Sequence, residues 1–363
     1  MTLNGQISLL AKVEDSFLAL GLGFDDPLVI MVSGGSDSVA LLLLTRELCL
    51  SAGGSVDNLL VLHVNHQLRG AEALADERFV VKLCEDLEVN CQVERRDVAA
   101  LASETGVGVE QAGRTIRYAL AEEARVALAE QADKETEAFC PDQNNTSRPL
   151  CPAILTAHTA DDRAETLLQR LIVGGGGSSL ASIPKQNGFV VRPLLECTRQ
   201  ELRDWLTEQN IHVDGSLWCE DATNLDTSHS RAFVRHELLP LIEKRNPRII
   251  EGLNRTAEIL TSEDAWMLEQ AVPLLPLTQD SFSAPLPLLR RAVYLACNQA
   301  ISELAPEARV TFEHVELIVQ KGNIPGFACQ IPGGIEVRNV QGQLVFKKAK
   351  PPKHNPKALK MGA

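Results

Sequence analysis

The stretch from Leu28 to Ser38 constrains the fold more than any other part of the chain. The apolar residues Leu28 to Val32 lead into the loop residues Ser33 to Ser38, and a second apolar run follows from Val39 to Leu44. A β-rich apolar run, a glycine–serine turn and a longer apolar run predict a strand, a loop and a helix. Unpaired backbone N–H groups and the helix dipole favour an anion at such a helix start. This junction is therefore predicted to bind phosphate.

The residues of this loop suit a polyphosphate ligand. Gly34 and Gly35 allow a tight turn and a close approach of the backbone. Asp37 could hold Mg²⁺ beside the phosphates. The hydroxyl donors of the loop are Ser33, Ser36 and Ser38. No lysine follows the glycines, which excludes G-x-x-x-x-G-K-[ST], and the spacing is not G-x-G-x-x-G. The alternative is a plain turn between a core strand and a core helix.

Length and composition indicate a globular intracellular protein. The 363 residues suggest about two or three domains. No apolar run approaches the ~20 residues that span a bilayer, and the N-terminus lacks a charged-then-apolar export pattern. The nine cysteines include no C-x-x-C pair, which is typical of reduced thiols. We therefore expect a cytoplasmic protein without a membrane partner.

The charge is distributed unevenly along the chain. The formal net charge is −13, which argues against indiscriminate binding to nucleic acid. Basic residues nevertheless outnumber acidic ones two to one between Arg231 and Arg255. From Val337 onward the chain has Arg338 and six lysines but no acidic residue. These two basic stretches could contact nucleic-acid phosphates, although basic tails are often only solvated.

Alternating apolar strands and helical segments predict an α/β fold with a doubly wound, mainly parallel sheet. We expect strands at 28–32, 59–64, 89–93, 153–157 and 189–191, and helices at 7–20, 72–87, 109–132, 161–172 and 198–210. The polar, Pro- and Asn-rich residues 133–152 are interpreted as an inserted surface loop. The composition divides the chain into a first domain at 1–230, a helical region at 231–321 and a short β segment with a basic tail at 322–363.

A second group of candidate residues follows the strand at 153–157. His158, Asp162 and Glu165 are spaced to share one side of a helix start, where they suit Mg²⁺ binding or proton transfer. Arg114 and Arg117 lie on one face of the helix at 109–132. The alternatives are a helix N-terminus with favourable acids and a solvated helix face.

Taken together, these motifs resemble the tRNA(Ile)-lysidine synthetases of the PP-loop (N-type ATP pyrophosphatase) superfamily. The resemblance covers roughly residues 28–240 in the order of the family. Besides Ser33–Ser38 it rests on the segments His63–Arg69, Arg114–Tyr118, Thr156–Thr166, Arg192–Leu195, Trp218–Asn224, Arg231–Arg235 and Leu238–Pro240. It implies ATP-dependent joining of lysine to carbon 2 of the wobble cytidine in the CAU anticodon of tRNA(Ile). The reaction would pass through an adenylylated cytidine. The resemblance also implies that residues 1–230 are the PP-loop catalytic domain and that the helical region at 231–321 binds tRNA.

The resemblance also implies roles for individual residues. Ser33, Gly34, Gly35, Ser36, Asp37 and Ser38 would bind ATP, with Asp37 near Mg²⁺. Positions linked to activity in the family match Arg114, His158, Asp162, Glu165 and Arg231. Asp162 or Glu165 could pair with the ammonium of lysine, and His158 is a possible base.

Two features depart from the family pattern. The insertion at 133–152 is expected to lie away from the site, and the part after Lys321 is expected to lack the second C-terminal domain of longer members. The competing functions are a PP-loop tRNA thiolase and a non-catalytic tRNA- or nucleotide-binding protein. The absent C-x-x-C pair counts against the first, and the complete acid and histidine set against the second.

Overall fold

The computed structural model describes residues 8–68, 70–139, 150–220 and 230–349. The chain forms two compact units, Met1–Ile259 and Leu260–Ala363. The division falls within the long helix α11 (Ile249–Ala271), later than the expected start of the helical region at residue 231. Each unit has its own apolar core, so each is described by itself.

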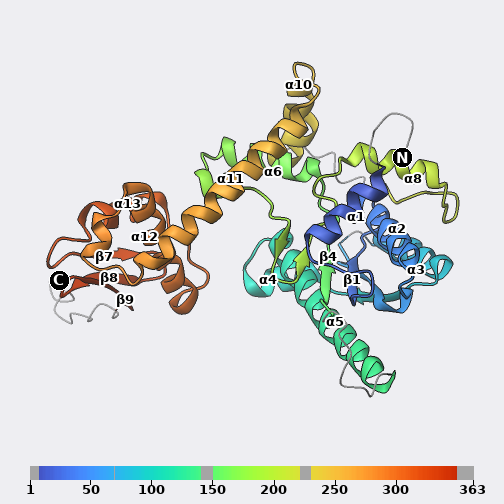
Figure 1. Ribbon diagram of the computed structural model, residues 1–363, viewed down its shortest axis with the longest axis horizontal. Helices are drawn as coiled ribbons and strands as arrows, with labels where there is room; N and C mark the ends of the chain where they lie inside the picture. The colour runs from blue at the N-terminus through green and yellow to red at the C-terminus, as the bar shows by residue number, and fades with distance from the viewer. Residues whose placement is uncertain (1–7, 69, 140–149, 221–229, 350–363) are drawn as a thin grey trace, which may run out of the picture. The chain divides into compact units, whose positions relative to one another are not determined.

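A six-stranded sheet forms the centre of the first unit (Figure 1). Its order is β3 (Asn90–Arg95), β2 (Leu59–Asn65), β1 (Leu28–Met31), β4 (Ala153–Leu155), β6 (Val190–Val191) and β5 (Gln186–Asn187). Leu28 of β1 pairs in parallel with Leu59 on one side and with Ala153 on the other. Only β5 of these six runs antiparallel. The predicted doubly wound, mainly parallel sheet is therefore confirmed.

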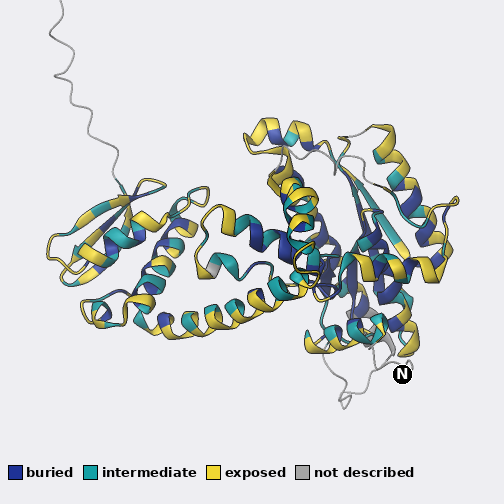
Figure 2. Cartoon of the chain, turned by 90° about the horizontal axis from the view of Figure 1, so that it is seen from above, coloured by how far each residue is buried: buried dark blue, intermediate teal, exposed yellow. Residues whose placement is uncertain are grey.

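Helices cover both faces of the sheet because successive residues of β1 point to opposite sides. Leu28 and Ile30 join the core under α1 (Leu9–Ala19), α2 (Ser36–Ser51), α3 (Ala71–Leu87) and α8 (Arg199–Gln209). Val29 packs instead with Leu120 and Ala124 of α5 (Val109–Phe139). The central strands β1, β2 and β4 are mostly buried, whereas the outer faces of the helices are exposed (Figure 2).

The strand order places two loops side by side. The chain moves from β1 outward to β2 and β3, and then returns to place β4 on the other side of β1. The loop after β1 and the loop after β4 therefore lie at a topological switch point, where doubly wound sheets bind their ligands. The loop after β4 leads into α6 (Ala160–Ile172).

The expected loop at 133–152 begins later than predicted. Helix α5 continues to Phe139, because the residues after Ala132 are mostly good helix formers and the first proline comes at Pro141. Residues 140–149 of that expected loop lie outside the described residues. Helix α4 (Val98–Thr105) was not expected, although Asp97 caps its start and Gly106 ends it, which are typical helix signals. The two-residue strand β5 was not expected either.

Helices follow the sheet, as the sequence predicts for residues after 231. They are α9 (Ser230–Phe233), a π-helical segment (Val234–Leu238), α10 (Leu239–Glu243) and α11. Val234 and Leu239 are buried against Leu168 of α6. This small apolar contact fixes α9 and the π-helical segment beside the start of α6.

The second unit combines helices with a small sheet. Helices α12 (Leu286–Leu304) and α13 (Phe312–Lys321) pack with β7 (Ala328–Ile331), β8 (Ile335–Val340) and β9 (Gln343–Lys348). The strands are antiparallel in the order β7-β8-β9, which confirms the expected terminal strands. Short 3₁₀ helices at Val272–Leu274 and Asp280–Ser283 lie in the Pro- and Leu-rich stretch before α12. In the first unit, a four-residue helix α7 (Gly177–Leu180) follows α6.

Within the described ranges, no helix is both long enough and apolar enough to cross a bilayer. The eight cysteines in those ranges are all free thiols.

Candidate active site

The loop after β1 has the conformation that its glycines predict. Gly34 has a φ of +97°, a region that L side chains rarely adopt, and Gly35 is the N-cap of α2. A Cβ at Gly34 would lie 3.3 Å from Sγ of Cys219, whose backbone N–H donates to the Gly34 carbonyl at 2.9 Å. The Ser38 hydroxyl accepts from the Ser33 N–H at 3.2 Å and donates to the Gly35 carbonyl at 2.9 Å. The loop is therefore held in a tight curve around the start of α2.

The acidic side chains at the start of α6 cap the helix and also contact arginines. Thr159 and Asp162 form a capping box, in which Asp162 Oδ2 accepts from the Thr159 N–H at 2.9 Å. The alternative that these acids only stabilise a helix N-terminus thus holds for one oxygen of Asp162. The other oxygen, and the fully buried side chain of Glu165, face a group of arginines.

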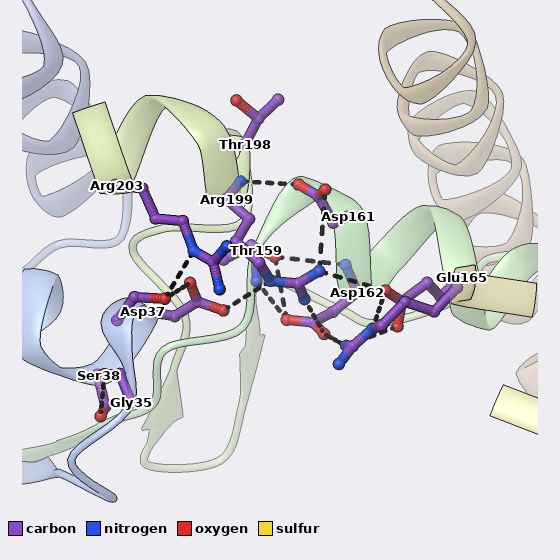
Figure 3. A network of polar contacts seen from close by, with 12 residues as sticks. Gly35, Asp37, Ser38, Thr159, Asp161, Asp162, Glu165, Thr198, Arg199 and Arg203 are labelled. Carbon is purple, nitrogen blue, oxygen red and sulfur yellow. Dashed lines mark hydrogen bonds and ion pairs between the residues drawn. The ribbon is translucent and has the colours of Figure 1, made fainter. Parts of the chain in front are cut away.

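Arg199, the first residue of α8, connects the two loops (Figure 3). Its Nε lies 3.1 Å from Asp37 Oδ2, its Nη2 lies 3.2 Å from Asp162 Oδ1, and its Nη1 lies 3.5 Å from Glu165 Oε1. Its backbone N–H donates to Asp161 Oδ2 at 2.8 Å. We call Ser33–Ser38 the phosphate loop, after its predicted ligand. Arg199 therefore joins the carboxylate of this loop and those of α6 in one network.

Arg231 and Arg235 approach the same carboxylates from α9 and the π-helical segment. Arg231 Nη2 lies 2.9 Å from Asp162 Oδ1 and its Nε lies 3.3 Å from Glu165 Oε2. Arg235 Nε donates to Glu165 Oε1 at 2.7 Å. We call Asp37, Asp161, Asp162, Glu165, Arg199, Arg231 and Arg235 the carboxylate–arginine cluster.

The protonation of the acids follows from their surroundings. Burial raises the pKa of Asp37 above its ordinary value, although Arg199 opposes it. Burial raises the pKa of Asp161 in the same way. Burial would also raise the pKa of Asp162, but Arg199 and Arg231 outweigh it and lower that pKa. Asp162 therefore carries its negative charge because the arginines surround it.

His158 is a neutral side chain next to this cluster. Its Nδ1 lies 3.0 Å from the Thr156 hydroxyl. The pKa of His158 is lowered to about 4, chiefly by burial and also by Arg192, Arg231 and Arg114, while Asp162 acts in the opposite direction. At neutral pH the ring is uncharged and suits hydrogen bonding.

The structure brings together four of the predicted catalytic residues: Asp37, Asp162, Glu165 and Arg231. Among the described residues, no hydrogen bond or ion pair joins Arg114 to these four; its guanidinium lies over the ring of Tyr118, 4.9 Å from the ring centre. Sequence reasoning missed Arg199 and Arg235. Arg235 had a usable signal, because it lies one helical turn after Arg231. The T-x-x-E capping signature at Thr198–Glu201 predicts the helix start at Arg199, but it does not show that this start lies at the site.

In the part of the chain that the structure describes, no three His, Cys, Asp or Glu side chains converge on a metal position. Mg²⁺ that arrives with a nucleotide needs only one or two protein carboxylates, since phosphates and water complete its shell. Asp37, with its position in the loop, fits that requirement.

A parallel sheet whose switch point carries a glycine–serine phosphate loop and a carboxylate–arginine cluster defines a nucleotide-binding α/β protein. Residues 12–242 match the sequence model of the family described as "PP-loop domain", and the chain belongs to this family.

Curated relatives extend this similarity along most of the chain. The chain is 36% identical to a tRNA(Ile)-lysidine synthase of Thermus thermophilus, over 92% of this chain and 59% of the relative. It is 34% identical to one of Parabacteroides distasonis, over 72% and 53% of the respective chains, and 30% identical to one of Clostridium acetobutylicum, over 89% and 66%. The chain thus spans about three fifths of the length of the first of these relatives.

Among solved structures, a U34-tRNA thiolase of Methanococcus maripaludis superposes with a TM-score of 0.47 at 18% identity, covering 70% of this chain and 78% of that one.

Proposed function

We propose that this protein ligates lysine to carbon 2 of the wobble cytidine in the CAU anticodon of tRNA(Ile), with ATP as co-substrate. The observation that supports this most is the single cluster in which the Asp37 carboxylate of the phosphate loop meets the carboxylates of α6 through Arg199. The names of the relatives point to the same reaction. We place the reaction in the cytoplasm, where tRNA and ATP are present.

The proposed reaction has two steps. First, O2 of the cytidine attacks the α-phosphorus of ATP, and the bond to pyrophosphate breaks. Second, the side-chain amine of lysine attacks carbon 2, AMP leaves with the oxygen, and the amine loses a proton. The products are lysidine, AMP and pyrophosphate.

Residues of this chain supply binding and charge for the first step. Backbone N–H groups at the start of α2 and the serine hydroxyls of the loop would bind the phosphates. Asp37 would hold Mg²⁺, which neutralises charge on the phosphates when it is bound. Arg199 and Arg231 carry raised pKa values beside the carboxylates, despite burial that lowers them, so both stay cationic toward a leaving pyrophosphate.

The second step needs an ammonium partner and a proton acceptor. Asp162 and Glu165 are the acids that could pair with lysine. A histidine whose pKa is about 4 is a poor acceptor for the proton of a lysine ammonium, whose usual pKa is about 10. We therefore assign His158 a hydrogen-bonding role, in place of the role as a base that the sequence left possible.

The competing functions have less support. A thiolase of this superfamily would need cluster-binding cysteines, and the sequence has no C-x-x-C pair. A non-catalytic tRNA-binding protein would have no need for a cluster that joins the phosphate loop to two buried acids.

Incorporation of labelled lysine into tRNA(Ile) transcripts tests the proposal. We expect incorporation that requires ATP, with release of AMP, and none into a transcript whose wobble cytidine is replaced by uridine. Labelled sulfur incorporation, or binding of tRNA without any lysine transfer, would contradict it and support the respective alternative.

A further inference from the structure

Arg199 is fixed at both ends of its side chain. Its backbone is held by the capping box of α8, in which the Thr198 N–H donates to Glu201 at 2.6 Å, and by its own N–H bond to Asp161. Its guanidinium reaches Asp37 on one side and Asp162 with Glu165 on the other. One cation is thus shared between the phosphate loop and the acids of α6 (Figure 3).

Asp162 and Glu165, the two buried acids of α6, already have donors around their oxygens, including Arg199 Nη1 at 3.5 Å from Glu165 Oε1. Asp162 Oδ1 lies within 3.3 Å of nitrogen atoms from Arg199, Arg231 and Arg235. Its Oδ2 accepts from the N–H and the hydroxyl of Thr159. Glu165 is fully buried and accepts from Arg231 and Arg235 through both oxygens. Because each carboxylate oxygen offers about two lone-pair sites, an incoming ammonium must displace a guanidinium.

The charges of the cluster show which guanidinium can leave. Four carboxylates, of Asp37, Asp161, Asp162 and Glu165, share the three guanidiniums of Arg199, Arg231 and Arg235. A triphosphate beside Asp37 would add strong acceptors within reach of Arg199, and guanidinium binds phosphate bidentately. Among the described residues, the hydrogen bonds and ion pairs of Arg231 and Arg235 go to Asp162 and Glu165, and none goes to the loop at 33–38.

We propose that Arg199 links the two substrate sites: a polyphosphate in the loop draws its guanidinium away from Asp162 and Glu165, which then accept the ammonium of the amino-acid substrate. This inference rests on the proposed function and adds a binding order to it. Arg199 is a positioning residue in this scheme. By linkage, nucleotide raises the affinity for lysine, and lysine raises that for nucleotide by the same factor.

Calorimetric titration of lysine into the full chain, with and without Mg²⁺ and a non-cleavable α,β-methylene analogue of ATP, tests the link. We expect lysine to bind the wild-type protein at least about tenfold more tightly with the analogue, within the usual range of coupling between sites. In Arg199→Gln the ratio of the two affinities should fall to within about twofold of one. Its nucleotide-free affinity for lysine should rise, because one competing cation is gone.

Arg248→Gln is the matched control, since it removes the same charge from an exposed pair with Glu251. It should keep the wild-type ratio. If thermal melting shows that Arg199→Gln is unfolded, Arg199→Lys takes its place, because lysine keeps the charge but cannot bridge three carboxylates as a fork. The proposal is overturned if the analogue leaves the lysine affinity of the wild-type protein unchanged. It is also overturned if the folded Arg199 variant shows the same increase in lysine affinity as the wild type. Lysine transfer to tRNA that proceeds with uncoupled binding refutes only the Arg199 link, whereas absent transfer refutes the proposed function.

Discussion

At the scale of single residues, we expect the chemistry at the loop Ser33–Ser38 to depend on one carboxylate, that of Asp37. Asp37 is the first-turn acid of α2, and its contacts are the Ser36 hydroxyl and Arg199. We expect Asp37→Ala to lower ATP-to-pyrophosphate turnover at least about 100-fold, because the loss of metal-supported charge neutralisation raises the barrier by several kcal/mol. Pyrophosphate release with tRNA and lysine present is the measurement.

Asp86→Ala provides the comparison for this variant. Asp86 forms an exposed i,i+4 pair with Lys82, and the loss of such a pair costs little. Its turnover should match that of the wild type. Near-normal pyrophosphate release by a folded Asp37→Ala protein would remove Asp37 from the proposed mechanism.

The pKa of His158 makes a prediction about stability and pH. The folded pKa is about 4 and the ordinary value is 6.5, so the unfolded chain takes up a proton first as the pH falls. The stability associated with neutral His158 is complete above about pH 6.5 and is lost as the pH falls toward 4. Between pH 7 and pH 5, the free energy of unfolding should therefore fall by about 1–2 kcal/mol more in the wild type than in His158→Gln. Urea titrations of both proteins at the two pH values measure this difference.

All other titrating groups are common to the two proteins, so the comparison isolates His158. Equal losses in both proteins would show that His158 titrates in its ordinary range. In that case it could serve as the general base after all.

At the scale of elements, the strand, loop and helix around Gly34 form the best-defined unit of the site. Gly34 has a positive φ, and a methyl group there would press on Cys219. We expect Gly34→Ala to lower the free energy of unfolding by about 1–2 kcal/mol, because the left-handed conformation is strained for alanine. It should also raise the KM for ATP about tenfold, because the loop shifts away from the phosphates. Chemical unfolding and pyrophosphate-release kinetics are the two measurements.

Gly108→Ala serves as the control at this scale, since a Cβ at Gly108 meets no atom within 4 Å and no positive φ is involved. That variant should keep the wild-type KM. An unchanged KM in Gly34→Ala would show that the curve of the loop is not needed for ATP binding.

The elements also show what a sequence can and cannot predict. The phosphate loop was predictable because the strand, the glycines and the helix are adjacent in the chain, so local preferences and function agree. Arg199 was not, because its partners Asp37, Asp162 and Glu165 lie far from it in sequence and only the strand order brings them together. The sequence predicts the end of helix α5 at residue 132, but the helix continues to Phe139. The polar residues that follow residue 132 suggest a loop, although alanine and charged residues favour helix. Strand β5 has two residues, which is too short for any periodic pattern.

At the scale of the whole molecule, the basic end of the chain is the least expected feature of an acidic protein. Lys347 and Lys348 belong to β9, and the Lys348 ammonium donates to the Leu304 carbonyl. The other four lysines of the predicted tRNA contact, Lys350, Lys353, Lys357 and Lys360, lie outside the described residues. A cut after Phe346 would damage the small sheet, whereas removal of residues 350–363 leaves β9 intact.

We expect removal of residues 350–363 to weaken tRNA binding and to flatten its dependence on salt. Each lost phosphate contact reduces the slope of log affinity against log salt by about 0.7–0.9, so the loss of contacts from four lysines changes the slope by about 3 to 4 at most. Turnover at saturating tRNA should stay near the wild-type value, because the carboxylate–arginine cluster lies in the first unit. The measurement is the tRNA affinity of both proteins at several salt concentrations. Exchange of the four lysines for glutamine in the full chain is the control, since it keeps the length of the segment and removes only its charge. An unchanged slope in both variants would leave the basic stretch from Arg231 to Arg255 as the remaining candidate for phosphate contacts.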